Sequence, residues 1–387
     1  MCKIRGLCMH IGFDGKRFFQ NVTGLGNYAR STVLGLAENF PQHRYTLYAP
    51  RLGGPFCTMP LPNALHVQEA CPVGRAFPAL WRSLAIPVAA SRDHVDIYHG
   101  LSHELPLTNF PPQVRTVVTM HDLLFLTHPH LYPWADRKLY AWKYRRSCRQ
   151  ADLVVAISAR TAEDVQELFG IGPDRIRVAY QSCNPAFSAP MDSANLDGLR
   201  CRLDLPRDFV LFVGSLIERK GVHTLIEAVS HLPQGDRPYL VIAGTGPLEA
   251  ALREQARSAG LESRTRFLGR VADADLPGLY RLARVFAYPS VGEGFGIPIL
   301  EALASGTPVV TSTGSCFAEA GGDAALYAAP ADPGGLAAAL AHALGDEDLR
   351  RDMIERGLRH AENFRIERTS ARLMDIYEEL AAGGNAR

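Results

Sequence analysis

Short runs of almost continuously apolar residues alternate with amphipathic segments along the chain. The amphipathic segments, typical of helices, include residues 28–40, 158–170, 223–232 and 247–260. The apolar runs read as strands at residues 5–13, 45–50, 95–100, 114–122, 151–158, 209–215, 238–244, 265–269, 284–290 and 307–312. Strands that lack polar alternation are buried on both faces, so the pattern predicts an α/β protein with parallel sheets covered by helices.

The chain has 387 residues, more than one hydrophobic core usually organises, so we expect two domains. Residues 184–200 are rich in Pro, Ser, Asn and Asp and are interpreted as a linker. We predict two doubly wound, Rossmann-like domains with a cleft between them. The first comprises residues 1–188, with a C-terminal helix at about 369–387 packing back onto it, and the second comprises residues 189–368. Ligands of such sheets bind beyond the carboxyl ends of the strands.

Composition narrows the class of protein further. Apolar residues make up 47% of the chain and charged residues 21%, as in ordinary soluble proteins. The eight cysteines form no CxxC pair, so we expect neither a zinc site nor a disulfide framework, but a reducing, cytoplasmic setting. The first residues contain no long apolar run, so no signal peptide is expected, and no stretch approaches the ~20 apolar residues of a membrane span.

Charge differs between the two halves. Residues 1–188 contain 20 Lys and Arg against 13 Asp and Glu, a balance of +7, and the remainder contains 21 against 27, a balance of −6. Residues 137–149 carry six Lys or Arg among aromatic residues. This segment is either the solvated face of a helix or a basic surface that docks on anionic lipid, with Trp134 and Trp142 at the interface.

One stretch, VGEGFGIPILEALASGTPVVTS at 291–312, places a carboxylate inside an apolar run. The glycine-rich part predicts a loop that presents backbone N–H groups at the start of a helix. Glu301, on that helix, must then be paired, hydrogen-bonded or open to a ligand. A ribose diol offers two donors to one carboxylate. The alternative is that Glu301 binds no ligand and only interacts favourably with the positive end of the helix dipole.

The Glu-x7-Glu string in EGFGIPILEALASGTPVV resembles the signature of retaining glycosyltransferases of family four, mannosyltransferase-like enzymes with the GT-B fold. In the second half, FVGSLIERKG, LVIAGTGP, FLGRVADADLPGLYRLARVFAYPS and CFAEAGGDAALYAAP resemble the family as well. In the first half, TGLGNYAR, DIYHGLSHELP, TMHDLLFLTHP and ADLVVAISARTAEDV do so more weakly. The resemblance therefore covers nearly the whole chain.

The resemblance implies roles for individual residues. Glu293 would hold hydroxyls of the donor sugar, Lys220 and Arg219 would neutralise the diphosphate leaving group, and His121 would reach the donor sugar. Glu301 would hold the ribose. The remaining residues implied at the donor are Gly24, Gly26, Ser215, Gly244, Gly246, Arg270, Val271, Gly294, Phe295, Gly296 and Leu300.

The implied function is transfer of a hexose, of mannose or glucose type, from a nucleotide-diphosphate sugar to a saccharide acceptor in polysaccharide biosynthesis, with retention of configuration. The expected partners are that donor, a saccharide acceptor that a lipid could carry, and an anionic membrane surface at which the protein would be peripheral. No metal, cofactor or nucleic acid is expected. The alternatives are a nucleotide-sugar epimerase of similar fold and a non-catalytic sugar-binding protein.

Some signals compete with this interpretation. Many family members have arginine where this chain has Ser215. We therefore expect Arg219 to take the place of that arginine at the diphosphate. The alternative is that Arg219 points to solvent and Lys220 acts alone. GLGNYA at 24–29 fits the dinucleotide pattern GxGxxA, but it does not directly follow a strand. DAD at 273–275 matches a metal-binding DxD, but capping of the next helix is the preferred account. His121 could also be a satisfied histidine at the end of a strand.

Overall fold

The computed structural model describes residues 8–383, and these divide into two compact units. Unit 1 contains residues up to Ser182 together with those from Ile366 onward, and unit 2 spans Cys183–Arg365. The sequence placed the corresponding boundaries after residues 188 and 368. Some predictions extend beyond the described residues. Residues 5–7 of the predicted strand 5–13 and residues 384–387 of the predicted helix 369–387 lie outside them. So does the start of the chain, on which the signal-peptide prediction rests.

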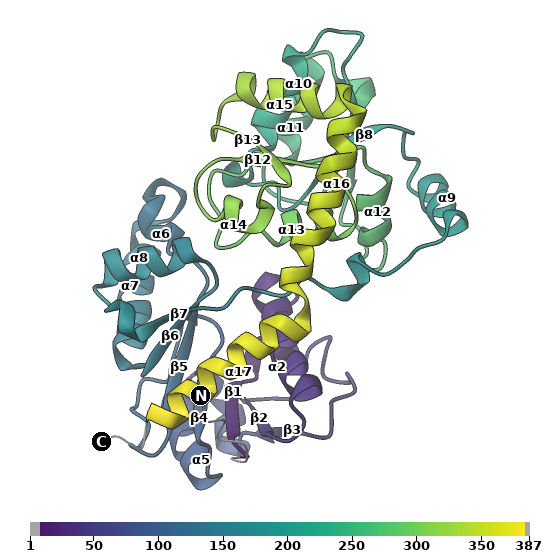
Figure 1. Ribbon diagram of the computed structural model, residues 1–387. Coiled ribbons are helices and arrows are strands. Elements are labelled where there is room, and N and C mark those ends of the chain that lie inside the picture. Colours follow the sequence, from purple (N-terminus) through teal and green to yellow (C-terminus); the bar gives the residue numbers. More distant parts are fainter. Residues whose placement is uncertain (1–7, 384–387) are drawn as a thin grey trace. The chain divides into compact units, whose positions relative to one another are not determined.

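Unit 1 is built on a seven-stranded parallel sheet with the order β3-β2-β1-β4-β5-β6-β7 (Figure 1). Its strands are β1 (His10–Asp14), β2 (Arg44–Ala49), β3 (Leu65–Glu69), β4 (Ile97–Gly100), β5 (Arg115–Met120), β6 (Leu153–Ala156) and β7 (Ile176–Val178). Its helices are α1 (Lys16–Gln20), α2 (Gly24–Asn39), α3 (Pro72–Ala76), α4 (Pro78–Leu80), α5 (Ile86–Arg92), α6 (Leu124–Thr127), α7 (Trp134–Gln150), α8 (Ala159–Phe169) and α17 (Ile366–Gly383).

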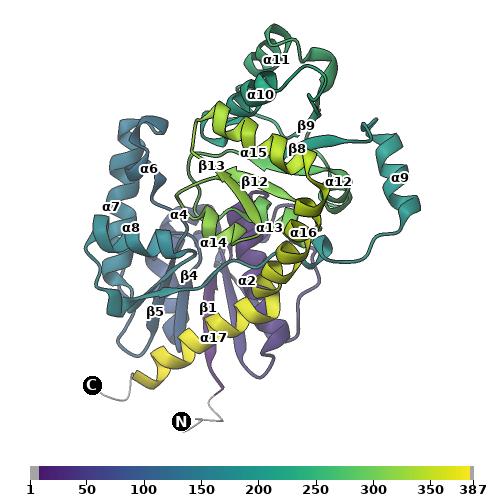
Figure 2. The same cartoon turned by 45° about the horizontal axis from the view of Figure 1, so that its top comes forward.

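The helix α17 joins unit 1 from the far end of the sequence. It packs against α2, as Figures 1 and 2 show from two directions. Its Tyr377 is fully buried, and the phenol hydroxyl lies 2.6 Å from Nδ1 of His99 on β4. A buried hydrogen bond therefore ties the last helix to the centre of the first sheet.

Unit 2 is built on a six-stranded parallel sheet with the order β10-β9-β8-β11-β12-β13. Its strands are β8 (Phe209–Val213), β9 (Tyr239–Ala243), β10 (Thr265–Gly269), β11 (Val285–Tyr288), β12 (Val309–Ser312) and β13 (Ala325–Ala328). Its helices are α9 (Ser193–Arg202), α10 (Val222–His231), α11 (Glu249–Ser258), α12 (Leu276–Leu282), α13 (Ile297–Ala304), α14 (Phe317–Gly321), α15 (Pro333–Gly345) and α16 (Glu347–Ala361).

The interpretation of residues 184–200 as the linker between the domains is wrong in part, because unit 2 already begins at Cys183. The helix α9 begins within this segment, because the Asp192 side chain accepts a hydrogen bond of 2.7 Å from the Asn195 N–H and caps the first turn. The sequence also missed β3, β7 and β13. All three are edge strands with partly exposed residues, so they lack the continuous apolar run that marks the central strands.

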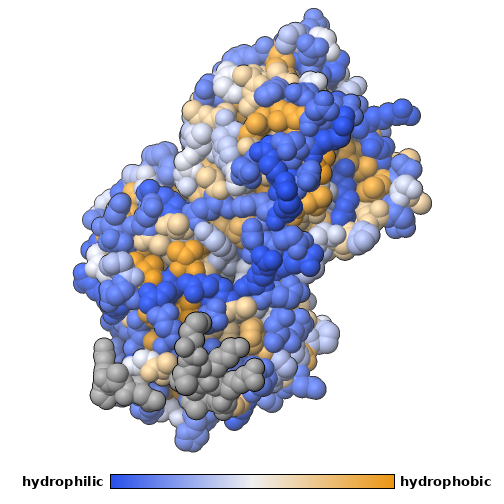
Figure 3. All heavy atoms as spheres, viewed as in Figure 1, coloured by the Kyte–Doolittle hydropathy of each residue, from blue (hydrophilic) through white to orange (hydrophobic). Residues whose placement is uncertain are grey.

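Burial follows the predicted pattern in the central strands. Every residue of β1, β4, β6, β11 and β12 is buried. On the face shown in Figure 3, apolar side chains lie in patches among hydrophilic ones. The seven described cysteines are all free. None of the described helices is both long and apolar enough to span a membrane.

Candidate active site

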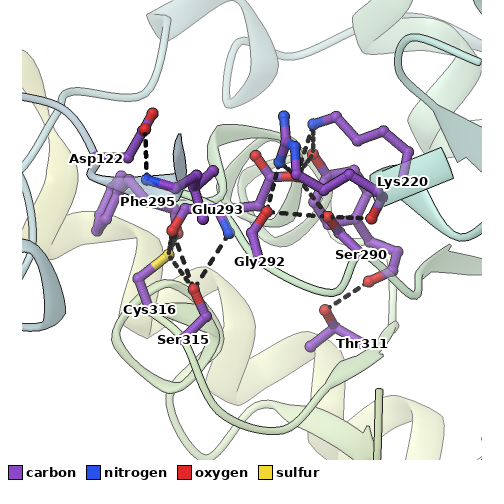
Figure 4. Close-up of polar contacts among 12 residues, drawn as sticks. Asp122, Lys220, Ser290, Gly292, Glu293, Phe295, Thr311, Ser315 and Cys316 are labelled. Carbon is purple, nitrogen blue, oxygen red and sulfur yellow. Dashed lines mark hydrogen bonds and ion pairs between the residues drawn. The ribbon is translucent and has the colours of Figure 1, made fainter. Parts of the chain in front are cut away.

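Glu293 lies in the loop between β11 and α13, at the carboxyl edge of the unit 2 sheet. Contacts with a second loop, which follows β12, hold its backbone. The Glu293 N–H donates to Oγ of Ser315 over 3.2 Å, and this hydroxyl donates to the Glu293 carbonyl over 3.0 Å (Figure 4). The Cys316 thiol donates to the Phe295 carbonyl over 2.9 Å. Hydrogen bonds at Glu293 and Phe295 therefore hold the loop against its neighbour.

One oxygen of Glu293 collects four donors. Its Oε1 lies 2.7 Å from Nζ of Lys220 and 2.6 Å from Nη1 of Arg219. The Ser290 hydroxyl donates to the same oxygen over 2.6 Å, and the Tyr288 phenol does so over 3.1 Å. Among residues 8–383, no group hydrogen-bonds to the other oxygen, Oε2. The carboxylate is thus anchored through one oxygen and has the second available for a ligand.

The charges of this cluster shift its pKa values. Burial alone would raise the pKa of Glu293, but the charges and hydrogen bonds of Lys220 and Arg219 outweigh it and lower the pKa to about 2. Burial also lowers the pKa of Lys220, although Glu293 opposes that shift. Glu293 is therefore ionised at neutral pH and pairs with two basic side chains, Lys220 and Arg219.

The two cations come from the short 3-10 helix Glu218–Lys220 that follows β8. Since β8 and β11 are neighbours in the sheet, the loops after them meet. The Arg219 carbonyl accepts hydrogen bonds from the Val291 N–H over 2.9 Å and from the Ser290 hydroxyl over 3.0 Å. Arg219 also donates to the Gly292 carbonyl. The alternative in which Arg219 points to solvent is therefore wrong.

Glu301 lies in the second turn of α13. The first turn of this helix contains no acidic residue, so a simple preference for the positive helix end does not account for Glu301. Its Oε2 accepts a hydrogen bond of 2.9 Å from the phenol of the buried Tyr280. Burial, with a smaller contribution from Asp273, raises the pKa of Glu301 to about 7. No cation pairs with Glu301 among the described residues, so the carboxylate remains available to hydroxyl donors.

Two glycine turns of unit 2 pack directly against each other. Gly244, after β9, approaches Gly214, after β8, so closely that a Cβ on Gly244 would clash with the Gly214 carbonyl. Gly246 packs in the same way on the Leu216 carbonyl. Of the other residues implied at the donor, Ser215 and Arg270 are exposed, Val271 and Gly294 are partly buried, and Phe295, Gly296 and Leu300 are buried.

In unit 1, His121 directly follows β5 and is buried. Its Nε2 lies 2.8 Å from the Leu101 carbonyl, which can only accept, so Nε2 carries the proton. Burial lowers the pKa of His121 to about 3, so the ring is neutral and Nδ1 is a hydrogen-bond acceptor. The neighbouring Asp122 carboxylate accepts a hydrogen bond from the Leu124 N–H over 3.1 Å.

The glycines at the start of α2 differ from each other. Gly26 packs on the Asn21 carbonyl, where a Cβ would clash, and its N–H donates to the Asn21 side chain over 3.2 Å. Gly24 is exposed, and no atom lies near the position of a Cβ. Packing within unit 1 thus requires glycine at 26 but not at 24.

The capping interpretation of DAD at 273–275 is wrong for its last residue. Asp275 occupies the N-cap position of α12, but its side chain makes no capping hydrogen bond and instead forms an ion pair with Arg202. The described residues contain no group of three or more His, Cys, Asp and Glu side chains arranged to hold a metal ion.

Sequence reasoning missed several residues of the cluster. Tyr288 and Ser290, which hold Glu293, lie in the AYPS segment directly before its loop, and Ser315 follows the next strand. A polar residue at the carboxyl end of an otherwise apolar strand is the signal that could have found the first two. Tyr280 carried no such signal, because it reaches Glu301 from the middle of a helix.

The two parallel sheets with their helices, and the acidic and basic residues at the edge of the second sheet, are the features of a glycosyltransferase of the GT-B fold. Comparison with known proteins agrees. The family model "Glycosyltransferase Family 4" matches residues 22–187, and "Glycosyl transferases group 1" matches residues 202–360. The chain belongs to the family-four glycosyltransferases.

Individual relatives are similar over most of the chain. The O-antigen chain mannosyltransferase B of Escherichia coli is 33% identical over 296 residues, which cover 75% of this chain and 76% of that protein. The D-inositol 3-phosphate glycosyltransferase of Corynebacterium glutamicum is 34% identical over 257 residues, or 62% of each chain. The structure of HepE from Anabaena with UDP and glucose matches with a TM-score of 0.73 and 18% identity, covering 96% of this chain and 100% of that one.

Proposed function

We propose that this protein transfers a hexose from a nucleotide-diphosphate sugar to a saccharide hydroxyl, with retention of the anomeric configuration, in polysaccharide biosynthesis. The observation that carries the proposal is the cluster in which Lys220 and Arg219 meet Glu293 at the carboxyl edge of the unit 2 sheet. Similarity to the Escherichia coli mannosyltransferase favours mannose as the transferred sugar. Glucose is the alternative, because the HepE structure is a complex with UDP and glucose.

The cluster supplies the electrostatics that such a transfer requires. When the sugar leaves, negative charge grows on the diphosphate, and cations that are already fixed stabilise it without reorganising. Arg219 brings a planar guanidinium, whose geometry suits binding to two phosphate oxygens at once. The free Oε2 of Glu293 accepts from a hydroxyl of the sugar, and Glu301 accepts from the ribose. His121 offers Nδ1 to another sugar hydroxyl.

The first test is a panel of donors with a saccharide acceptor. GDP-mannose, UDP-glucose, UDP-galactose and UDP-N-acetylglucosamine are each incubated with methyl α-D-mannopyranoside, and the product is analysed by NMR. Transfer with the donor's anomeric configuration supports the proposal. Inversion at the anomeric carbon contradicts retention, epimerised nucleotide sugar points to an epimerase, and unchanged donors point to a protein that only binds sugars.

We further propose that transfer needs no metal ion, since Lys220 and Arg219 already supply positive charge for the diphosphate. The test is turnover in excess chelator. Complete loss of activity that added Mg²⁺ or Mn²⁺ restores would contradict the proposal.

An anionic membrane surface is the partner we propose for unit 1, as expected for a lipid-carried acceptor at the inner face of a membrane. On α7, Trp134 and Trp142 are 69% and 55% exposed, and Leu139 is exposed beside them. A groove of about 1030 Å³ borders this helix and is lined by Trp142, Arg145 and Arg149 together with apolar residues such as Phe110 and Leu126. Exposed tryptophans among cations suit the interface between lipid headgroups and acyl chains.

A further inference from the structure

His103 lies in the loop after β4, at the carboxyl edge of the unit 1 sheet, and is only 7% exposed. The strand β5, which ends directly before His121, is the neighbour of β4 in the sheet. The loop places the two imidazole rings 4.9 Å apart, centre to centre. His103 has no role in the site described above.

The backbone of His103 is held in an unfavourable conformation. Its φ of 65° lies in the left-handed region, which few residues other than glycine adopt. Hydrogen bonds on both sides impose it: the His103 N–H donates to the Thr119 carbonyl over 2.9 Å, and the Leu105 N–H donates to Oγ of Ser147 over 3.0 Å. Such conformations persist where the surroundings enforce them, and they cluster at functional sites.

The hydrogen bonds of His103 also determine its tautomer. Its Nε2 accepts from the backbone N–H of His121 over 3.1 Å, so Nε2 carries no proton. Burial lowers the pKa of His103 to about 3, so the ring is neutral and its one proton is on Nδ1. The ring cannot easily turn, since it stacks on Tyr144 at 4.5 Å with an angle of 9° between the planes.

No group in residues 8–383 accepts a hydrogen bond from Nδ1 of His103. Some buried side-chain atoms of the protein have no partner and lie where solvent cannot reach them, but Nδ1 of His103 is not one of these. This atom is therefore accessible to solvent. His121 has the opposite arrangement, with its proton on Nε2 and a lone pair on Nδ1. The two neighbouring rings thus offer one N–H donor and one acceptor, both uncharged. A hydroxyl group can accept from one and donate to the other, which neither an ether oxygen nor a carboxylate can do.

We propose that His103 is a substrate contact, and that its Nδ1–H donates a hydrogen bond to a sugar hydroxyl on unit 1. This rests on the proposed function, and the hydroxyl comes from either the acceptor or the donor sugar. The rigid backbone and the stacked ring hold the N–H in place before the sugar binds, which lowers the entropy cost of binding.

The tautomer is tested first, since it requires no substrate. In long-range ¹H–¹⁵N spectra of histidine-labelled protein, His103 is expected as the Nδ1–H form and is assigned by the loss of its signals in His103→Asn. The Nε2–H form would overturn the proposal whether or not the protein transfers sugars.

Kinetics then distinguish the two sources of the hydroxyl. The variants are His103→Phe, which keeps the stacked ring, and His103→Asn, which tolerates the left-handed backbone. The matched control is His94→Asn, because exposed His94 has a φ of 55° just before the same strand. The substrates are GDP-mannose and methyl α-D-mannopyranoside, and thermal unfolding is followed for every variant.

Loss of one neutral hydrogen bond changes an equilibrium or rate constant by roughly two- to twelvefold. We therefore expect His103→Phe to lower kcat/KM by about tenfold and His103→Asn to recover part of this loss. A lower kcat/KM for the acceptor, with hydrolysis of GDP-mannose unchanged, identifies an acceptor hydroxyl as the partner of His103. A decrease in both kcat/KM and the hydrolysis of GDP-mannose identifies a hydroxyl of the donor sugar. Unchanged kcat/KM in His103→Phe, or losses that only follow a lowered Tm, would overturn the proposal. Absence of transfer in the parent would instead contradict the mannosyl form of the proposed function.

Discussion

Nζ of Lys220 lies 2.7 Å from Oε1 of Glu293, so an internal carboxylate holds this cation. Arg219 holds the same oxygen. The carboxylate thus keeps one cation when the other is removed, and substitution of either cation should affect catalysis more than folding.

We expect Lys220→Ala and Arg219→Ala each to lower turnover efficiency by about 10- to 150-fold. A hydrogen bond to a charged group is worth roughly 1.5–3 kcal/mol, and each 1.36 kcal/mol is about tenfold in rate. Arg207→Ala, at an exposed arginine of the same unit, is the control and should change little. Circular dichroism checks folding. Activity of Arg219→Ala within about twofold of the parent would leave Lys220 as the one functional cation of the pair.

Ser215→Arg should partly restore the activity of Arg219→Ala. Ser215 is exposed in the loop after β8, the loop that also carries Arg219, so a guanidinium there can reach the same anion. The matched comparison is Ser215→Ala in the Arg219→Ala background, assayed with the same donor. Equal rates in the two double variants would show that position 215 cannot supply the missing charge.

Diphosphate binding should depend on the ionisation of Glu301. Because its pKa is raised to about 7, the carboxylate that accepts from a ribose diol predominates only above that pH. Calorimetry with GDP and UDP should therefore show affinity rising between pH 6 and pH 8 in the parent. Glu301→Gln should bind more weakly and lose this rise, whereas Glu293→Gln should mainly lower turnover. Unchanged affinity in Glu301→Gln would refute the ribose role.

The stability provided by Glu293 should disappear in acid. Its pKa is lowered from 4.5 to about 2 in the folded protein, so its contribution is full above pH 4.5 and is lost as the pH falls towards 2. Glu293→Gln also leaves two largely buried cations without their anion, which typically costs about 3–5 kcal/mol.

Urea unfolding of unit 2 should therefore show a large difference between parent and Glu293→Gln at pH 7 that narrows by pH 3. Glu249→Gln removes an exposed ion pair with Arg253 and serves as the control, with an expected effect of about 0–1 kcal/mol. A difference that is the same at both pH values would mean that the pKa of Glu293 is not lowered.

Vesicles containing anionic lipid should bind the protein at low salt and release it at high salt, since charge interactions are screened beyond ~10 Å at 0.1 M. Trp142→Ala should weaken sedimentation with the vesicles, and Arg145→Glu combined with Arg149→Glu should weaken it further. Arg207→Glu, in unit 2, is the control for a charge reversal away from α7. Binding that is absent, or that salt does not change, would leave α7 as an ordinary solvated helix.

The sequence predicted the central strands and the Glu293 loop because both leave strong local signals. A buried parallel strand is a continuous apolar run, and a glycine-rich loop before an apolar helix marks the carboxyl edge of such a sheet. Edge strands such as β3 lack that run because part of their surface meets solvent.

The contacts that Glu293 and Glu301 make with residues distant in sequence left no comparable signal. Ser315 reaches Glu293 from the loop after another strand, and Tyr280 reaches Glu301 from another helix. Contacts between residues that are distant in sequence depend on the order of strands in the sheet, which local patterns do not specify. His103 lies in the segment DIYHGLSHELP, but its left-handed backbone and its tautomer follow only from tertiary contacts.

The return of α17 to unit 1 has a consequence for synthesis on the ribosome. Tyr377 is a buried hydrogen-bond partner of His99, and the 183 residues from Cys183 to Arg365 are translated before it. At about 5–20 residues per second, roughly 10–40 s separate the last residue of the first sheet from the helix that completes its core. During that interval the nascent first unit exposes the apolar face that α17 later covers, so it is the stage at which chaperones have most to bind.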